Sequence, residues 1–172
     1  EDFLSLGKLE EGLIQVKSEP INLPAFIKHV CDDLKEVSHP HQILDLNHNG
    51  TSDVNTDKHL LKNILINLLT NAIKFSPETG TISVSSEVKK NNFIISVSDS
   101  GIGISNEDQQ HLFDRFFRGR NALNIKGTGL GLHIVAKYVG LLGGNISFIS
   151  KLNEGTTFTI QFPLNQKIRK PF

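Results

Sequence analysis

The sequence of 172 residues contains no methionine, no tryptophan, one tyrosine and one cysteine. The lone thiol, Cys31, excludes an internal disulfide and has no metal-ligand spacing around it, which favours a reducing, cytoplasmic compartment. No apolar run reaches the about 18 residues that cross a bilayer, and the first residues do not have the layout of a signal peptide. Because the chain also begins without methionine, we expect a fragment of a longer protein.

Neither sign of charge is in excess, because 18 lysine and arginine residues balance 18 aspartate and glutamate residues. A balanced chain without a polybasic block does not have the electrostatic features of a partner for nucleic acid or for a lipid surface. The length suits one main domain with a substantial core. We therefore expect no nucleic-acid partner and no membrane contact for this fragment.

Hydrophobic periodicity predicts which segments are helical and which are extended. Helical spacing indicates helices over residues 3–14, 23–37, 56–75, 106–117 and 129–142. Alternation of apolar and polar residues indicates strands over residues 43–46, 81–88, 93–98, 145–150 and 156–162, and Asn49-Gly50 is a turn signal. This order suits an α+β fold of two layers, a sheet with helices on one face.

A change of pattern near residue 20 marks a domain boundary. Asn22 is a candidate N-cap directly ahead of Pro24, so a new helix is expected to begin there. We assign residues 1–18 to the end of an earlier helix, residues 19–165 to the main domain, and the polar residues 166–172 to a frayed tail.

A polar stripe runs beside the apolar face of the predicted helix over residues 56–75. It consists of Asn63, Asn67, Asn71 and Lys74. Asparagine is a poor helix former, so three of them at intervals of four residues suggest a function. A solvated polar face explains the stripe equally well on this helix alone. The functional interpretation is that the side-chain oxygen of Asn71 binds Mg²⁺, which prefers oxygen ligands and bridges nucleotide phosphates.

A second motif, Asp99-Ser100-Gly101-Ile102-Gly103, directly follows the predicted strand over residues 93–98. An aspartate at a strand end can accept a hydrogen bond from an exocyclic amine, and glycines let the backbone approach a flat ring. Adenine offers both features. Taken alone, however, glycines after a strand more often indicate only a tight turn.

A third motif, residues 126–132, precedes the last predicted helix with Gly127, Gly129 and Gly131. Glycines before a helix expose its unpaired N–H groups, which together with the helix dipole form an anion site for phosphate. The spacing matches neither a Walker loop nor a dinucleotide fingerprint, which excludes two common nucleotide folds. By itself the segment fits a phosphate cradle and a flexible hinge equally well.

A fourth motif lies between the second and the third. Phenylalanines between residues 112 and 117 have the helical spacing of core residues, which is the simpler interpretation. Arg118, Arg120 and Lys126 differ, because they lie in a polar segment that has glycines near both ends and no apolar period. We expect this segment to be a lid whose cations close over phosphates.

Together and in this order, the four motifs resemble the N box, first glycine box, F box and second glycine box of histidine protein kinases. The resemblance covers residues 20–164, and residues 1–16 resemble the end of the second helix of the dimerisation and phosphoacceptor domain that precedes it. It implies the Bergerat ATP-binding fold, a two-layer α/β sandwich of a mixed sheet with helices on one face, here with a short N-terminal helix.

The resemblance implies roles for the residues of the N box and the lid. Asn71 would bind Mg²⁺, Asn67 would lie beside the phosphates, and Lys74 would contact phosphate. Phe75 would replace a common tyrosine beside the adenine, losing a hydroxyl but keeping a ring face. Asn67, Lys74 and Arg118 would be the catalytic residues.

The resemblance also implies how the base and phosphates would be held. Asp99 would recognise the adenine amine, supported through water by Thr156, while Gly101 and Gly103 would shape the base pocket. The second glycine box would bind the phosphates through Lys126, Gly127, Thr128, Gly129, Leu130, Gly131 and Leu132.

One position separates the enzyme classes that share this fold. DNA gyrase, mismatch-repair and heat-shock chaperone ATPases place a water-activating glutamate one helical turn before the metal-binding asparagine, where this chain has Asn67. Without that general base, water is poorly activated for attack on the γ-phosphate, so ATP is expected to be held and not rapidly hydrolysed. A nucleotide switch or ATPase of the same GHKL superfamily, and a non-catalytic interaction module, are the alternatives.

The phosphate acceptor is expected to lie outside this chain. In the family, the acceptor histidine is followed by an acidic residue and a little later by proline, and none of the histidines here has that context. The resemblance therefore implies ATP and Mg²⁺ as cofactors. It also implies two partners: the phosphoacceptor histidine domain of the same homodimeric parent, and a response regulator receiver domain. The parent would be cytoplasmic or anchored in the inner membrane.

Overall fold

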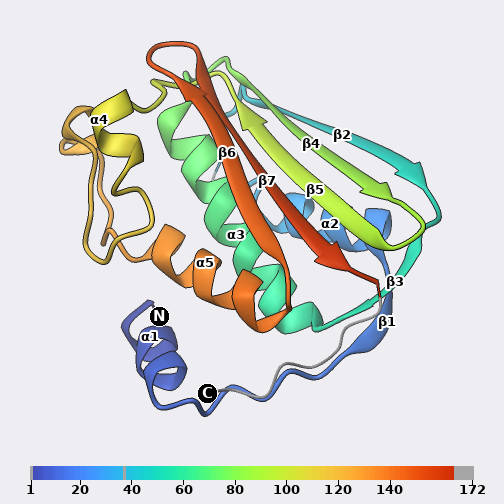
Figure 1. The fold of residues 1–172 in the computed structure, drawn as a ribbon. Helices are drawn as coiled ribbons and strands as arrows, with labels where there is room; N and C mark the ends of the chain where they lie inside the picture. The colour runs from blue at the N-terminus through green and yellow to red at the C-terminus, as the bar shows by residue number, and fades with distance from the viewer. Residues whose placement is uncertain (1, 37, 165–172) are drawn as a thin grey trace.

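A mixed sheet with helices on one face forms the main domain (Figure 1). The computed structural model describes residues 2–36 and 38–164. The strands are β1 Glu19–Asn22, β2 Ile43–Gly50, β3 Asp53–Thr56, β4 Thr81–Val88, β5 Asn92–Asp99, β6 Asn145–Lys151 and β7 Gly155–Pro163. The helices are α1 Asp2–Glu10, α2 Leu23–Asp33, α3 Lys58–Phe75, α4 Asn106–Gln109 and α5 Gly131–Leu141, with a 3₁₀ turn at Arg120–Ala122.

The larger sheet has the strand order β2-β4-β5-β7-β6, and β1 pairs with β3 in a second, two-stranded sheet. The β2–β4 pair is parallel and the other pairs are antiparallel. This arrangement confirms the predicted α+β class and its two layers.

The core lies between the sheet and helices α3 and α5, which cross its inner face (Figure 1). Every second residue of β5 is buried, and the ring of Phe93 lies 5.0 Å from that of Phe162 on β7. The outer face is polar: Ser96 and Thr159 hydroxyls are 3.0 Å apart, and those of Ser98 and Thr157 are 2.7 Å apart. Antiparallel sheets with one solvent-exposed face show this alternation of apolar and polar residues, and the same alternation in the sequence predicts these strands.

Helix boundaries follow from capping side chains. The Asn22 oxygen accepts a hydrogen bond from the Ala25 amide at 3.2 Å, which confirms the predicted N-cap of α2. The helix ends at Asp33, earlier than predicted, and residue 37 lies outside the described residues, as does the tail 166–172. Helix α1 ends at Glu10, before the predicted residue 14, because the chain turns at Gly12 with φ 64°.

The predicted helix over residues 106–117 is wrong beyond its first turn. Helix α4 ends at Gln109, whose side-chain amide donates to the carbonyl oxygens of Ile104 and Ser150. Turns follow, and Phe116 has φ 61°, a left-handed conformation that an α-helix does not contain. Tertiary contacts therefore override the helical spacing of this segment.

The region around residue 50 also differs from the prediction. The strand expected at residues 43–46 continues to Gly50, and β3 was not predicted. A β-carbon at Gly50, where φ is 91°, would meet the carbonyl oxygen of Val88 on the parallel neighbour. Glycine is required here by the close approach of two strands and not by a tight hairpin.

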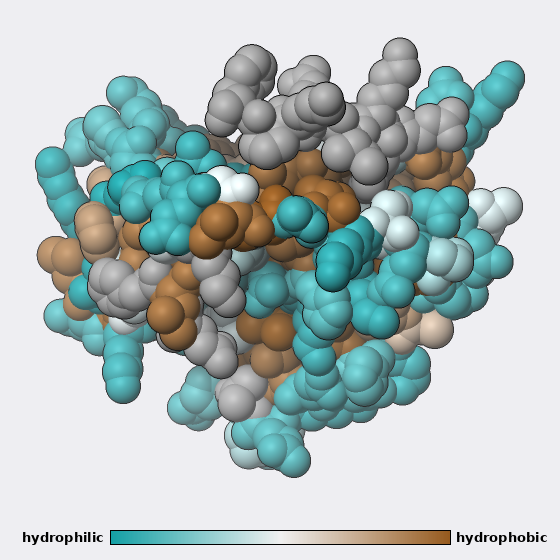
Figure 2. All heavy atoms as spheres, turned by 90° about the horizontal axis from the view of Figure 1, so that it is seen from below, coloured by the Kyte–Doolittle hydropathy of each residue, from teal (hydrophilic) through white to brown (hydrophobic). Residues whose placement is uncertain are grey.

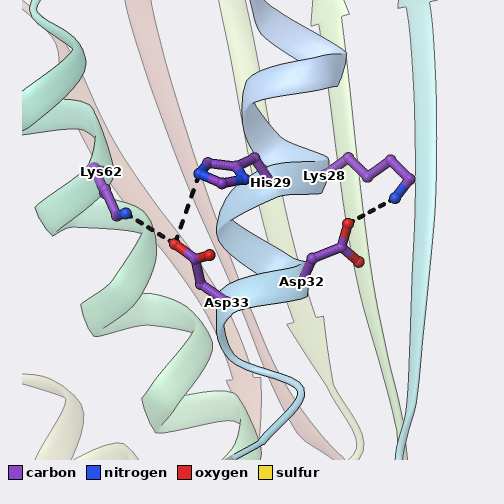
Figure 3. Close-up of polar contacts among 5 residues, drawn as sticks. All are labelled: Lys28, His29, Asp32, Asp33 and Lys62. Atoms are coloured by element: carbon purple, nitrogen blue, oxygen red, sulfur yellow. Dashed lines mark hydrogen bonds and ion pairs between the residues drawn. The ribbon is translucent and has the colours of Figure 1, made fainter.

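An ion-pair network joins α2 to α3 (Figure 3). The Lys62 ammonium lies 2.8 Å from the Asp33 carboxylate, linking the two helices. On α2, Asp32 pairs with Lys28 at 2.6 Å and with Lys35 at 2.7 Å. These lysines offset the unfavourable position of two carboxylates at a helix C-terminus.

The pKa of Asp32 is expected to be about 2, below its ordinary value of 3.8, because Lys28 and Lys35 donate hydrogen bonds to its carboxylate. A lowered pKa in the folded chain means that this interaction stabilises the fold above pH 3.8 and is lost as the pH falls through about 2. Carboxyl carbon shifts measured by NMR against pH will test this. Replacing Lys28 and Lys35 by alanine should return the midpoint towards 3.8, whereas Lys62→Ala should leave it unchanged; a wild-type midpoint near 3.8 would contradict the assignment.

Cys31 is buried on α2, and burial, with the nearby Asp32 charge, raises the pKa of its thiol to about 11.

Across the described residues, none of the helices combines the length and the apolar character that spanning a membrane requires. Seen from below, the surface mixes apolar and polar side chains (Figure 2).

Candidate functional site

A cavity of about 180 Å³ opens between α3, the end of β5, the segment before α5, and β7. Most of the residues predicted from the four motifs line it. These are Asn67, Asn71, Lys74, Phe75, Asp99, Gly103, Arg118, Lys126, Gly127, Thr128, Gly129, Gly131, Leu132 and Thr156. Of the predicted residues, Gly101, Leu130 and the lid cation Arg120 do not line the cavity; Leu130 is fully buried in the core, and Arg120 is exposed and pairs with Glu107 at 3.4 Å.

Asp99 lies at the end of β5, directly opposite Thr156 of β7. Its Oδ1 atom accepts hydrogen bonds from the backbone N–H groups of Gly101 at 2.8 Å and Thr156 at 3.3 Å. Burial nevertheless raises the pKa of this carboxyl, with the two backbone donors acting in the opposite direction. The side chain is therefore fixed in place, and a further donor supplied by a ligand would favour its charged form.

The glycines after Asp99 allow the loop to pass close to other backbone. A β-carbon at Gly101 would meet the carbonyl oxygen of Phe75, the last residue of α3. The neighbouring Ile102 amide donates to that same oxygen at 3.2 Å, which joins the loop to the helix. Gly103 has φ 63°, and a β-carbon there would meet the carbonyl oxygen of Lys151.

The asparagine stripe of α3 is partly engaged with its own helix. The side-chain amides of Asn63 and Asn67 each donate at 2.9 Å to the carbonyl oxygen four residues earlier. The Asn67 oxygen lies 2.6 Å from the place of a β-carbon at Gly131, so glycine lets the start of α5 approach α3. Asn71 lines the cavity one turn further along.

Side chains of the lid segment hold its shape over the cavity. The Arg118 Nη2 atom donates to the carbonyl oxygens of Ala122 at 3.1 Å, Leu123 at 2.9 Å and Ile125 at 2.5 Å. The Asn121 side-chain amide donates to the Gly103 carbonyl oxygen at 3.0 Å, which joins the lid to the loop after Asp99.

Several lining residues were not predicted from the sequence. Those are Thr70, Ile102, Ile104, Leu112, Phe117, Gly119, Asn121, Ala122, Ile125 and Phe158. Ile102 and Ile104 alternate with the glycines of the second motif, a pattern that marks apolar cavity walls in a loop. Phe117 was assigned to the core as one of several aromatics. Asn121 and Ile125 have no signal in the sequence, because only the folded lid brings them to the cavity.

Fold and cavity together define an α+β domain whose cavity is lined by residues of the four motifs. The family described as "Histidine kinase-, DNA gyrase B-, and HSP90-like ATPase" matches residues 56–166, and the chain belongs to it. Together with the relatives described next, this match confirms the predicted ATP-binding domain of the histidine kinase type.

Relatives and solved structures agree with this family. The chain is 35% identical to the circadian input-output histidine kinase CikA of Synechococcus elongatus, covering 94% of the chain and 22% of that protein. It is 32% identical to the histidine-protein kinase ArlS of Staphylococcus aureus, covering 94% of the chain and 36% of ArlS. The solved Acinetobacter baumannii histidine kinase AdeS superposes with a TM-score of 0.79 at 27% identity, covering 96% of this chain and 76% of that chain. The chain thus spans well under half the length of the first two relatives.

Proposed function

We propose that the cavity binds ATP with Mg²⁺ and that the chain donates the γ-phosphate to a histidine of a phosphoacceptor domain in two-component signalling. The observation that supports this most directly is the half-buried Asp99 carboxylate, whose Oδ1 is occupied by two backbone donors. Its Oδ2 would then accept a hydrogen bond from the exocyclic amine of adenine, beside the ring of Phe75.

We assign the phosphates to the part of the cavity that is lined by the segment before α5. Lys74 and Lys126 line the cavity and supply positive charge, and the start of α5 supplies N–H groups behind Gly127 and Gly129. Arg118 already uses Nη2 to bind lid carbonyls, so we propose that its other donors meet the phosphates.

A magnesium site on α3 fits the residues present. No group of three histidine, cysteine or acidic side chains suited to a metal occurs among residues 2–36 and 38–164. A hard cation that keeps several waters needs only one or two protein oxygens when phosphates supply the rest. The Asn71 amide oxygen would be that ligand, with Asn67 beside the phosphates, and the bound ion would neutralise phosphate charge.

ATP binding requires the lid to move. The cavity volume of about 180 Å³ is below the roughly 300–1,000 Å³ of typical ligand sites, and lid residues such as Asn121 and Ile125 line it. We infer that nucleotide displaces these side chains outward while the base pocket around Asp99 keeps its shape.

The parent protein would supply what this chain lacks. We propose that residues 1–18 are the end of a phosphoacceptor helix, that residues 19–165 are the catalytic domain, and that the acceptor histidine lies upstream in the same homodimeric, cytoplasmic or inner-membrane-anchored parent. A response regulator receiver domain would accept the phosphate next. Because Asn67 stands where related ATPases have glutamate, phosphate release to water is expected to be slow, and a phosphate-release assay separates this proposal from an ATPase.

Asn71→Ala is expected to remove most of the benefit of Mg²⁺ for ATP binding. Calorimetric titration of ATP with and without Mg²⁺ should show saturable binding to the wild type, strengthened by the ion. In the variant, the factor by which Mg²⁺ raises the ATP affinity should be at least about tenfold smaller. Removing even a residue that only orients a metal ligand costs about that much metal affinity. Asn63→Ala, on the same helix but outside the cavity, is the matched control. Absence of wild-type binding at millimolar ATP would overturn the proposed function.

A further inference from the structure

Asp57 is a buried carboxylate that belongs to two parts of the chain at once. Its side chain is 5% exposed. Oδ1 accepts hydrogen bonds from the backbone amides of His59 and Leu60, both at 3.0 Å, and so caps α3. Oδ2 accepts a hydrogen bond from the backbone amide of Lys17 at 2.7 Å, forty residues earlier in the chain. The helix cap is therefore also an anchor for the segment that follows α1.

Neighbouring contacts hold the same two segments together. The Lys58 ammonium, on the first residue of α3, lies 2.9 Å from the Glu19 carboxylate. Glu19 in turn pairs with Thr56 in the β1–β3 ladder. The Lys58–Glu19 ion pair joins partly exposed side chains, whereas Thr56 and Asp57 are buried and the Lys17–Asp57 bond is partly buried. A hydrogen bond to a charged group is stronger than one between neutral groups, so Asp57 adds a strong contact to those of the β1–β3 ladder.

The other end of this segment contacts the turns before the lid and helix α5. Arg115 forms an ion pair with Glu10, the last residue of α1, and Leu6 of α1 is buried where this helix contacts α5. Arg115 also donates through Nε to the His133 ring of α5 at 3.3 Å. The segment from Glu10 to Lys17 is thus attached at one end beside the lid and at the other to the start of α3.

We propose that Asp57 is a positioning residue that couples the segment after α1 to the nucleotide helix α3. The inference rests on the proposed function, because α3 carries Asn67 and Asn71. At a rise of 1.5 Å per residue, these two residues lie about 15 Å or more along the helix from its N-cap. A helix transmits displacement along its axis as a rigid element, so a ligand that stabilises α3 also stabilises its cap. By linkage, the position of the preceding segment and the occupancy of the nucleotide site then influence each other.

Asparagine at position 57 separates the two roles of this carboxylate. Asparagine caps helices about as well as aspartate, but its amide has one acceptor oxygen and one NH₂ group. With the oxygen on the amides of His59 and Leu60, the NH₂ group faces the Lys17 N–H, donor against donor. Asp57→Asn therefore removes the bond to Lys17 and keeps the cap, whereas Asp57→Ala loses both. Asp45→Asn removes the same charge from an exposed strand position and is the control.

Amide hydrogen exchange, measured by NMR on the whole chain with and without Mg-ATP, tests the coupling. In the wild type, Mg-ATP should slow exchange of the Lys17 amide by at least about twofold. In Asp57→Asn, that amide should exchange about tenfold faster or more and no longer respond to nucleotide, because a hydrogen bond to a charged group is lost. The His59 and Leu60 amides and the ATP affinity should each stay within about twofold of wild type.

The outcomes distinguish the coupling from the proposed function. Wild-type ATP binding without any change at the Lys17 amide would overturn the coupling and leave nucleotide binding standing. Unchanged Lys17 exchange in Asp57→Asn, or equal loss of protection at Lys17 and His59, would also overturn it. Absence of ATP binding in the wild type would instead be a failure of the proposed function itself.

Discussion

Asp99→Asn is expected to lower the affinity of this chain for ATP by about 10- to 100-fold, the range for losing a hydrogen bond to a charged group. The backbone N–H groups of Gly101 and Thr156 both require an acceptor, so the asparagine oxygen should take the place of Oδ1. Its NH₂ group would then face the exocyclic amine of adenine, donor against donor. The same geometry that keeps the residue in place makes the substitution unfavourable for the ligand.

Calorimetric titration of both chains with ATP checks this result. The unfolding temperature of Asp99→Asn should stay close to that of the wild type, because the two backbone bonds persist and a half-buried charge is removed. Thr156→Ser, which keeps the backbone donor and a hydroxyl, is a matched control that should bind ATP nearly as the wild type does. Equal ATP affinity in Asp99→Asn and wild type would show that adenine is not recognised by this carboxyl.

Gly103→Ala is expected to destabilise the chain by about 2–5 kcal/mol, the sum of a left-handed conformation and an overpacked contact. Gly103 has φ 63°, and its added methyl group would meet the carbonyl oxygen of Lys151 at the end of β6. The obstacle is backbone and cannot rotate away. Relief would require the loop after Asp99 to shift, so ATP affinity should fall together with stability.

Denaturant unfolding monitored by circular dichroism measures the effect. Gly127→Ala is the matched control, because a β-carbon there would meet nothing within 4 Å and its backbone is not left-handed. That variant should remain within about 0.5 kcal/mol of the wild type, as for an ordinary surface substitution. Equal stability of the two variants would contradict the close approach at Gly103.

The sequence was most informative where local pattern and tertiary environment agree. Helix α3 has a broad apolar face and was predicted nearly to its ends, and the alternation in β4 and β5 reflects one dry and one wet face. The short strands β1 and β3 were not foreseen, because four residues are too few to show alternation and their pairing is set by chain segments far apart. The turns after α4 were missed because Phe116 adopts its conformation through tertiary contacts.

In the candidate site too, residues of local motifs could be predicted from the sequence, whereas residues placed by tertiary contacts could not. Asp99, Asn71 and the glycines belong to short motifs whose chemistry can be recognised locally, and the structure brings nearly all of them to one cavity. The bonds of Arg118 to lid carbonyls, and the contact of Asn121 with Gly103, depend on how the lid folds back and have no local pattern. Asp57 was included in a predicted helix, but its bond to Lys17 links residues that no periodicity connects.

The burial of Cys31 makes this chain a convenient background for thiol-directed labelling. Maleimides and spin labels react with thiolate, and a thiol with a pKa of about 11 is ionised only to about one part in ten thousand at pH 7. The native cysteine can therefore stay in place while a new one is introduced at exposed Leu123 in the lid and another at exposed Ile149 on β6. Probes at those two positions would follow lid movement in solution without further alteration of the core.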